Sequence, residues 1–118
     1  MDRRDELKQQ YKHVEVQAGV FQIRNLRNGK IFLKATLNLT TINGQLFQLN
    51  ANSHRNTLLQ QEWNTFGQDA FVVEILETLS QQELTSLRAK DILRHLEEKW
   101  LNTLSPYGEH GYHRPPAA

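Results

Sequence analysis

The sequence predicts one small domain of the α/β (α+β) class, a three-stranded sheet that begins with a β-hairpin and is flanked by helices. Three observations lead to this fold class. An Asn-Gly pair separates two runs rich in aromatic and β-branched residues, a third such run follows later, and apolar residues recur at helical spacing around it. The 118 residues suffice for one hydrophobic core and are too few for two.

Composition limits the function classes without selecting one. The chain has no cysteine, which excludes disulfides and thiolate metal sites and fits a reducing compartment. Its first residues are charged throughout, unlike a signal peptide, and no apolar run is long enough to cross a bilayer. We therefore expect a cytoplasmic protein. The net charge of +1 is smaller than that of many nucleic-acid-binding proteins, so composition leaves the partner open.

The first element expected is a short helix over residues 2–11, which with a linker makes up residues 1–18. The hairpin follows, because Asn28 and Gly29 are favoured where a two-residue loop needs positive φ. In that register Asn25 lies opposite Phe32 and Ile23 lies opposite Lys34.

The hairpin register divides its side chains between two faces. One face carries Phe21, Ile23, Asn25, Phe32 and Lys34. The opposite face is more apolar, and we expect it to meet the core; its residues are Val20, Leu26, Ile31, Leu33 and Ala35.

Helices are expected near residues 40–50 and over residues 56–66, where Gly67 stops the second one. The apolar run at 70–79 predicts a strand buried on both faces. A capping box, "SQQE" at 80–83, opens the last helical region, and a change of apolar phase predicts a break at 88–90. Residues 19–113 form the expected domain and 114–118 a disordered tail.

Three segments resemble the GIY-YIG nuclease family in order and spacing. They are "GVFQIRNLRNGKIFLKATLNL", "SHRNTLLQQEWNTFGQDAFVVEILE" and "LEEKWLNTLSPYGEHGYH", and together they span about Gly19 to His113. The resemblance implies the same hairpin-first fold. It also implies hydrolysis of DNA phosphodiesters around one divalent metal ion, usually Mg²⁺.

The resemblance implies a site that is only partly retained. Phe21 and Phe32 stand where the family has tyrosines, and Lys34 stands where it has a glycine. Ile42 or Asn43 replaces an arginine that contacts the scissile phosphate, and no Arg or Lys occurs from 35 to 54. Glu97 matches the glutamate that binds the metal ion.

These replacements predict weakened catalysis. Phenylalanine keeps the shape of tyrosine but has no hydroxyl, and losing acid–base assistance costs roughly 10²–10⁴ in rate. Losing a preorganised positive charge costs roughly another 10²–10³. Lys34 replaces the missing arginine only in part, because an ammonium lacks the bidentate fork. His54 is a candidate base or alternative ligand, although a local packing or capping role suits it better.

The favoured interpretation is a nuclease-like domain that binds nucleic acid, DNA being the expected form, with impaired or lost hydrolysis. The candidate binding residues are Arg24, Arg27, Lys30, Lys34 and Arg55. One alternative is an active Mg²⁺-dependent DNA endonuclease that uses Glu97 with Lys34, Asn43 and His54 in unconventional roles. Another is a non-catalytic protein-interaction module. A single carboxylate such as Glu97 holds Mg²⁺ weakly unless phosphate oxygens and waters complete the shell.

Overall fold

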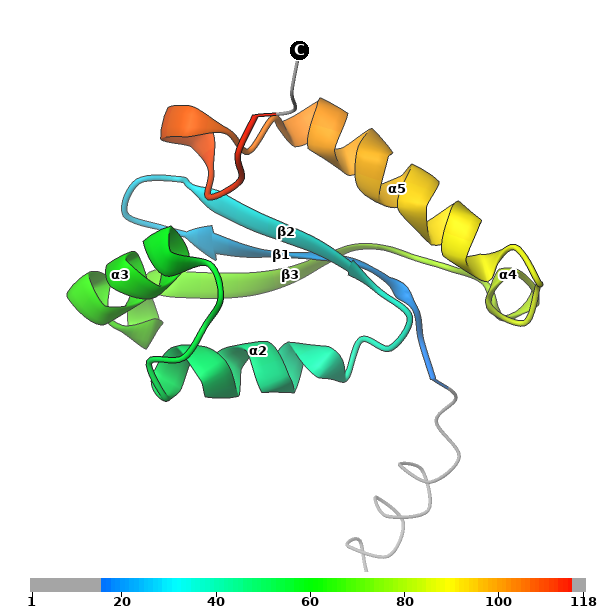
Figure 1. Ribbon diagram of the computed structural model, residues 1–118, viewed down its shortest axis with the longest axis horizontal. Helices are drawn as coiled ribbons and strands as arrows, with labels where there is room; N and C mark the ends of the chain where they lie inside the picture. The colour runs from blue at the N-terminus through cyan, green and yellow to red at the C-terminus, as the bar shows by residue number, and fades with distance from the viewer. Residues whose placement is uncertain (1–15, 116–118) are drawn as a thin grey trace, which may run out of the picture.

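The sheet lies between two sets of helices in the computed structural model, which describes residues 16–115 (Figure 1). In Figure 1, α2 (Thr41–Asn50) runs below the sheet, α3 (Thr57–Phe66) lies at its left end beside β3, and α5 (Ala89–Leu104) lies above it. The shorter elements are η1 (Gln68–Ala70), α4 (Gln81–Leu84) and η2 (Gly108–His110). The helix predicted over residues 2–11 lies outside the described part of the chain.

The three-stranded antiparallel sheet confirms the predicted fold class. Its order is β2-β1-β3, with β1 (Gly19–Asn25) between β2 (Ile31–Thr36) and β3 (Phe71–Thr78). The first strand is almost wholly buried, as a central strand covered on both faces must be. Both neighbouring strands are therefore edges of the sheet, and the candidate functional site lies at β2.

The hairpin register differs from the predicted one by two residues. Ile23 pairs with Phe32 and Phe21 pairs with Lys34, so residues 26–30 form the connection. The Asn25 amide donates to the Lys30 carbonyl at 2.9 Å, and the Gly29 amide donates to the Asn25 carbonyl at 2.7 Å. Only Gly29 needs the left-handed region, with φ of 77°. A shift of two residues leaves every side chain on its predicted face.

The prediction that the second hairpin face meets the core was wrong only about where the larger core lies, because Val20 and Leu33 of that face are buried. The larger core cluster forms on the opposite face, where Phe21, Ile23 and Phe32 meet residues from α2 and α3 such as Leu49 and Leu59. The second face contributes to a smaller cluster against α5, while Leu26 at its end is exposed. The sheet is covered on both faces, and the two helices that follow the hairpin in sequence cover the larger core.

The last strand was expected to be buried on both faces, and this was also wrong. β3 is an edge strand whose residues are mostly half-buried, and Ile75 is 53% exposed. The helical predictions nearby are confirmed. Ser80 and Glu83 form the reciprocal capping box of α4, and the chain breaks before α5 begins at Ala89. Among the described residues, no helix has the length and apolar character needed to cross a membrane.

Candidate functional site

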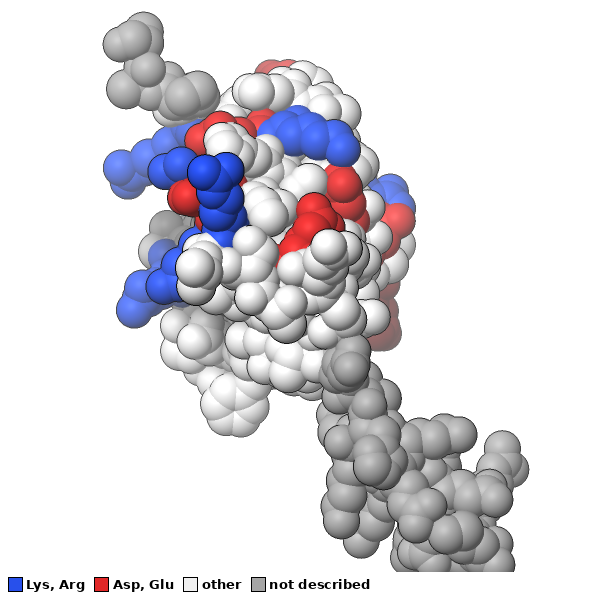
Figure 2. Space-filling model, turned by 90° about the vertical axis from the view of Figure 1, so that its right-hand side faces the viewer, with Lys and Arg blue, Asp and Glu red and all other residues white. Residues whose placement is uncertain are grey.

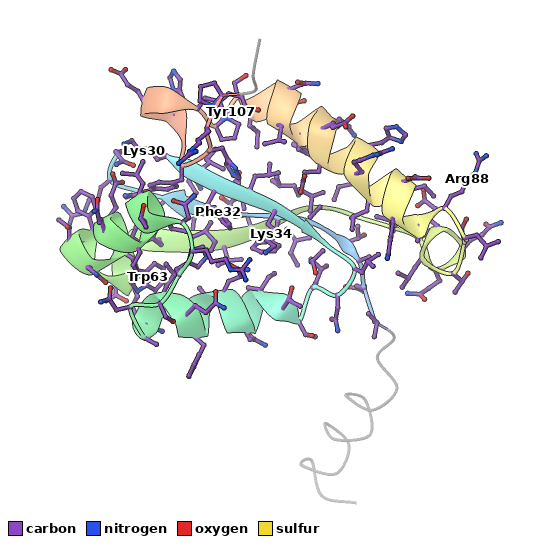
Figure 3. All side chains as sticks on the ribbon, in the orientation of Figure 1. Lys30, Phe32, Lys34, Trp63, Arg88 and Tyr107 are labelled. Carbon is purple, nitrogen blue, oxygen red and sulfur yellow. The ribbon has the colours of Figure 1, made fainter. Side chains whose placement is uncertain are left out.

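A hollow of about 430 Å³ lies where β2 faces the end of α2 and the loop before α3. We call it the lysine hollow, and it is lined by Phe32, Lys34, Gln45, Gln48, His54, Arg55 and Asn56. Figure 3 shows Phe32 and Lys34 along β2, on the side of the sheet that faces α2. The structure thus brings together four of the residues selected from the sequence, Phe32, Lys34, His54 and Arg55. It adds three amide side chains that sequence reasoning missed.

Hydrogen bonds fix the loop that carries His54 and Arg55. The buried Gln60 of α3 accepts from the His54 amide at 3.0 Å and donates to the Leu49 carbonyl at 2.9 Å. Asn56 caps α3 by accepting from the Leu59 amide at 3.0 Å. The wall of the hollow formed by this loop is therefore built on buried polar contacts.

Both ring nitrogens of His54 are engaged within the protein. Nδ1 accepts from the Asn56 amide at 3.0 Å, so the proton of the neutral ring lies on Nε2, which faces the side-chain oxygen of Gln45. Burial and the nearby Lys34 ammonium lower the pKa of His54 below its usual value of 6.5. In this arrangement the imidazole is neutral at pH 7 and has no unengaged nitrogen to accept a proton from water.

The two phenylalanines that stand where the resemblance implies tyrosines both pack against other side chains of the fold. Phe21 is fully buried in the larger core cluster. Phe32 is 8% exposed and lies between two imidazoles, with the His113 ring stacked on it and the His54 ring at its edge, each centroid 5.3 Å away. Neither ring carries a hydroxyl, so neither contributes acid–base chemistry.

Glu97 lies at the outer edge of β2. Its Oε2 accepts from the Ala35 amide at 3.1 Å, and His113 Nε2 accepts from the Leu33 amide at 2.8 Å. The Tyr112 amide donates to the Ile31 carbonyl at 3.0 Å on the same strand. Burial lowers the pKa of His113, although the Glu97 carboxylate acts in the opposite direction. The outer backbone groups of this edge strand are thus occupied by side chains and by the C-terminal segment.

The described residues do not fit a magnesium ion bound beside the lysine hollow. Magnesium requires near-octahedral oxygen coordination and is typically bound by one or two carboxylates together with substrate phosphates. Glu97 has one carboxylate oxygen committed to Ala35, and it does not line the hollow that holds the cations. Within residues 16–115, no group of three His, Cys, Asp or Glu side chains is arranged to hold a metal ion.

The candidate basic residues fall into three groups. Arg24 pairs with Glu74 of β3 at 2.8 Å, and Lys30 pairs with Glu62 of α3 at 3.4 Å. Lys34 and Arg55 line the hollow, are exposed, and have no salt bridge within the described part of the chain. Arg27 is exposed in the hairpin connection, outside the lysine hollow.

The uncharged helix α2 leaves the cations of the lysine hollow unopposed. Residues 35–54 contain no Lys, Arg, Asp or Glu, and the lower part of the face in Figure 2, where grey atoms do not cover it, is white. Asn43 is exposed on this helix and does not line the hollow. Among residues 16–115, the positive charge that lines the hollow therefore comes from Lys34 of β2 and from Arg55 of the loop before α3.

A second polar cluster that sequence reasoning missed joins α3, the hairpin and the C-terminal segment. Glu62 Oε1 accepts from the Tyr112 hydroxyl at 2.7 Å, from Asn28 at 2.8 Å and from the buried Asn25 at 3.2 Å. Burial and the Glu62 carboxylate raise the pKa of Tyr112, while hydrogen bonds and Lys30 lower the pKa of Glu62. The cluster holds the C-terminal segment against β2.

The architecture is a GIY-YIG-like fold, which confirms the fold expected from the resemblance. Over 80% of this chain and 95% of that one, the structure is similar to the catalytic domain of the homing endonuclease I-TevI, with a TM-score of 0.66 and 24% identity. A mutant of the same catalytic domain gives a TM-score of 0.62 and 22% identity over 75% and 84% of the two chains. No protein-family model and no curated protein sequence matches the chain.

Proposed function

We propose that this protein binds the phosphodiester backbone of nucleic acid in the lysine hollow and does not hydrolyse it efficiently. The observation that carries the proposal is the composition of the hollow wall. Two exposed cations, Lys34 and Arg55, stand among amide side chains, and no carboxylate lines the hollow among the described residues.

The binding part of the proposal rests on charge and hydrogen-bonding capacity. Lysine and arginine are the main partners of phosphate oxygens, and arginine can engage them bidentately. The amides of Gln45, Gln48 and Asn56 can donate to phosphate or to base edges, although Gln45 accepts from His54 with its oxygen. The similarity to a nuclease catalytic domain agrees with a nucleic-acid ligand.

The proposal that hydrolysis is inefficient rests on the state of each candidate catalytic group. His54 has both nitrogens engaged, and Phe32 offers no hydroxyl in place of tyrosine. Glu97 accepts a backbone amide at the edge of β2. Freeing His54 or Glu97 breaks a hydrogen bond of the fold, so binding without rapid cleavage is the activity that this arrangement supports best.

Fluorescence anisotropy with labelled oligonucleotides tests the binding. Lys34→Gln and Arg55→Gln should each weaken binding by a factor of about 3–10, because each removes one phosphate contact. Arg88→Gln is the matched control, since Arg88 is exposed near α4 at the far end of the molecule (Figure 3). Equal losses in all three variants, or no binding at low salt, would reject the lysine hollow as the binding site.

A cleavage assay separates the proposal from the endonuclease alternative. Plasmid and single-stranded DNA should remain intact with saturating protein and either Mg²⁺ or Mn²⁺. Nicking that disappears in Glu97→Ala, with the variant still folded by circular dichroism, would instead establish a metal-dependent enzyme. Binding that does not respond to salt would favour the protein-interaction alternative, because phosphate contacts release counterions.

A further inference from the structure

We infer that the ligand is a single-stranded polynucleotide whose backbone passes from the lysine hollow across Arg55 into a second hollow, with successive phosphates at Lys34, Arg55 and Arg114. This inference rests on the proposed function. It adds a second subsite and a substrate class.

The second hollow, which we call the C-terminal hollow, adjoins the first. Its volume is about 530 Å³, and its walls come from the first turn of α3, from η2 and from residues 111–115. Arg55 and Asn56 line both hollows, so they form the ridge between them. A ligand that leaves the lysine hollow over Arg55 therefore enters the C-terminal hollow directly.

The two hollows form one positively charged track. The lysine hollow contributes Lys34, the shared ridge contributes Arg55, and the C-terminal hollow contributes Arg114. All three side chains are exposed, and no Asp or Glu of the described chain lines either hollow. By contrast, the hairpin cations Arg24 and Lys30 are paired with carboxylates. The track thus offers phosphate three cations with no carboxylate on its described walls.

The wall that carries Arg114 is held in place by contacts on both sides. The His113 ring accepts from the Leu33 amide at 2.8 Å, and the His113 amide donates to the Pro106 carbonyl at 3.1 Å. The Asn56 side chain donates to the Tyr112 carbonyl at 2.9 Å, which ties this wall to the ridge between the hollows. Arg114 follows these anchored residues directly, so binding requires little ordering of the backbone there.

A track through two adjoining hollows favours a single strand over a duplex. A flexible single strand can follow a bent path into both hollows, whereas a duplex resists bending over such short lengths, with a persistence length of about 50 nm. Binding of single strands commonly combines a positively charged groove with contacts that tolerate any sequence. DNA and RNA share this backbone chemistry, so the test includes a strand of each with the same sequence.

The test measures the dependence of affinity on salt, using a labelled single strand as DNA and as RNA of the same sequence, and the DNA duplex. Three phosphate contacts predict a slope of log K against log salt of about −2 for a single strand. Arg114→Gln should make that slope shallower by about 0.7, and Lys34→Gln should do the same, because each removes one contact. Arg88→Gln should leave it unchanged. The duplex should bind at least about tenfold more weakly at the same salt concentration.

Oligonucleotide length provides a second measurement. Affinity should rise with each phosphate up to three, and Arg114→Gln should reduce the number at which the rise levels off. If single strands bind through Lys34 and Arg55 but Arg114→Gln changes neither slope nor length dependence, the track is wrong and the proposed function stands. A duplex that binds as tightly as the single strand also overturns the track. If neither ligand binds at low salt, both proposals fail.

Discussion

The outer edge of β2 and the face of β2 that lines the lysine hollow both meet ionisable side chains, but these side chains differ in kind and in how far the fold engages them. At the edge, Glu97 and His113 accept backbone amides of the strand. On the face, Lys34 and the neighbouring Arg55 have no salt bridge in residues 16–115. Groups that can move protons or hold a metal ion are thus committed to the fold, while groups that attract phosphate remain accessible. The comparison is the physical basis of the proposal that this protein binds phosphate groups without hydrolysing them efficiently.

The edge contacts have a physical reason. An edge strand presents unpaired N–H and C=O groups, which are costly when buried and invite pairing with other chains when exposed. In this protein the edge of β2 is covered by α5 and by the C-terminal segment, whose residues supply the missing partners. Substitutions at the edge should therefore change stability, whereas substitutions in the hollow should change binding.

The largest effect is expected at His113. His113→Ala should lower the free energy of unfolding by about 2 kcal/mol, because the Leu33 amide loses its acceptor and Phe32 loses a stacked ring. Urea denaturation followed by circular dichroism measures the change. His110→Ala is the control, since His110 is exposed and its ring makes none of these contacts. Equal stability of the two variants would contradict the assigned role of His113.

The next effect is expected at Glu97. Glu97→Ala should lower the free energy of unfolding by about 1–2 kcal/mol, since it removes a charged acceptor from the Ala35 amide. Glu97→Gln keeps an acceptor oxygen and should lose less than half as much, and Glu98→Ala at an exposed position should be neutral. An equally large loss in the Gln variant would show that the charge of Glu97 matters for another reason.

Acid should destabilise the protein through His54 and His113. Their pKa values are lowered in the folded state, so the unfolded chain binds protons first. Their contribution to stability is complete above pH 6.5 and is lost as the pH falls through the lowered values. Unfolding measured at a series of pH values should show this loss. His113→Gln, which keeps an acceptor without titrating, should reduce it; an unchanged pH dependence would exclude His113 as a contributor.

The smallest effect on stability is expected in the hollow. Lys34→Gln and Arg55→Gln should change the free energy of unfolding by less than about 0.5 kcal/mol, because both side chains are exposed. The same two variants should weaken binding to oligonucleotides. A loss of stability as large as that of Glu97→Ala would mean that the cations of the hollow support the fold and would remove the contrast between edge and face.

Local signals in the sequence predicted most of the fold. The capping box at Ser80, the stop at Gly67 and the change of apolar phase before Ala89 act over a few residues, and the structure confirms all three. The hairpin register and the burial of β3 depend on distant partners. The backbone of Asn25 forms the last hydrogen bonds of the hairpin, two residues before the predicted position. Its side chain donates to Tyr112 and Glu62, which lie far away in sequence. The Asn-Gly pair alone did not predict this hairpin register.

The sequence predicted only part of the site, again because some of its residues are placed by contacts between segments that are distant in sequence. Phe32 and Lys34 share a face because side chains alternate along a strand. His54 and Arg55 come directly after α2, which packs on that same face of the sheet. Gln45 and Gln48 are ordinary helix residues by pattern, and only the packing of α2 against the sheet places them in the hollow. His113 lies in a turn-rich segment, and nothing local predicts that its ring reaches β2.

Amide hydrogen exchange at Ala35 tests most directly whether the Glu97 carboxylate stays hydrogen-bonded to the backbone of β2. The wild-type amide should be protected, its protection should fall selectively in Glu97→Ala, and added Mg²⁺ should leave it unchanged because the carboxylate stays with the strand. Rapid exchange in the wild type would contradict this account. So would loss of protection at Ala35 on adding Mg²⁺, which would show the carboxylate leaving the backbone for the metal ion.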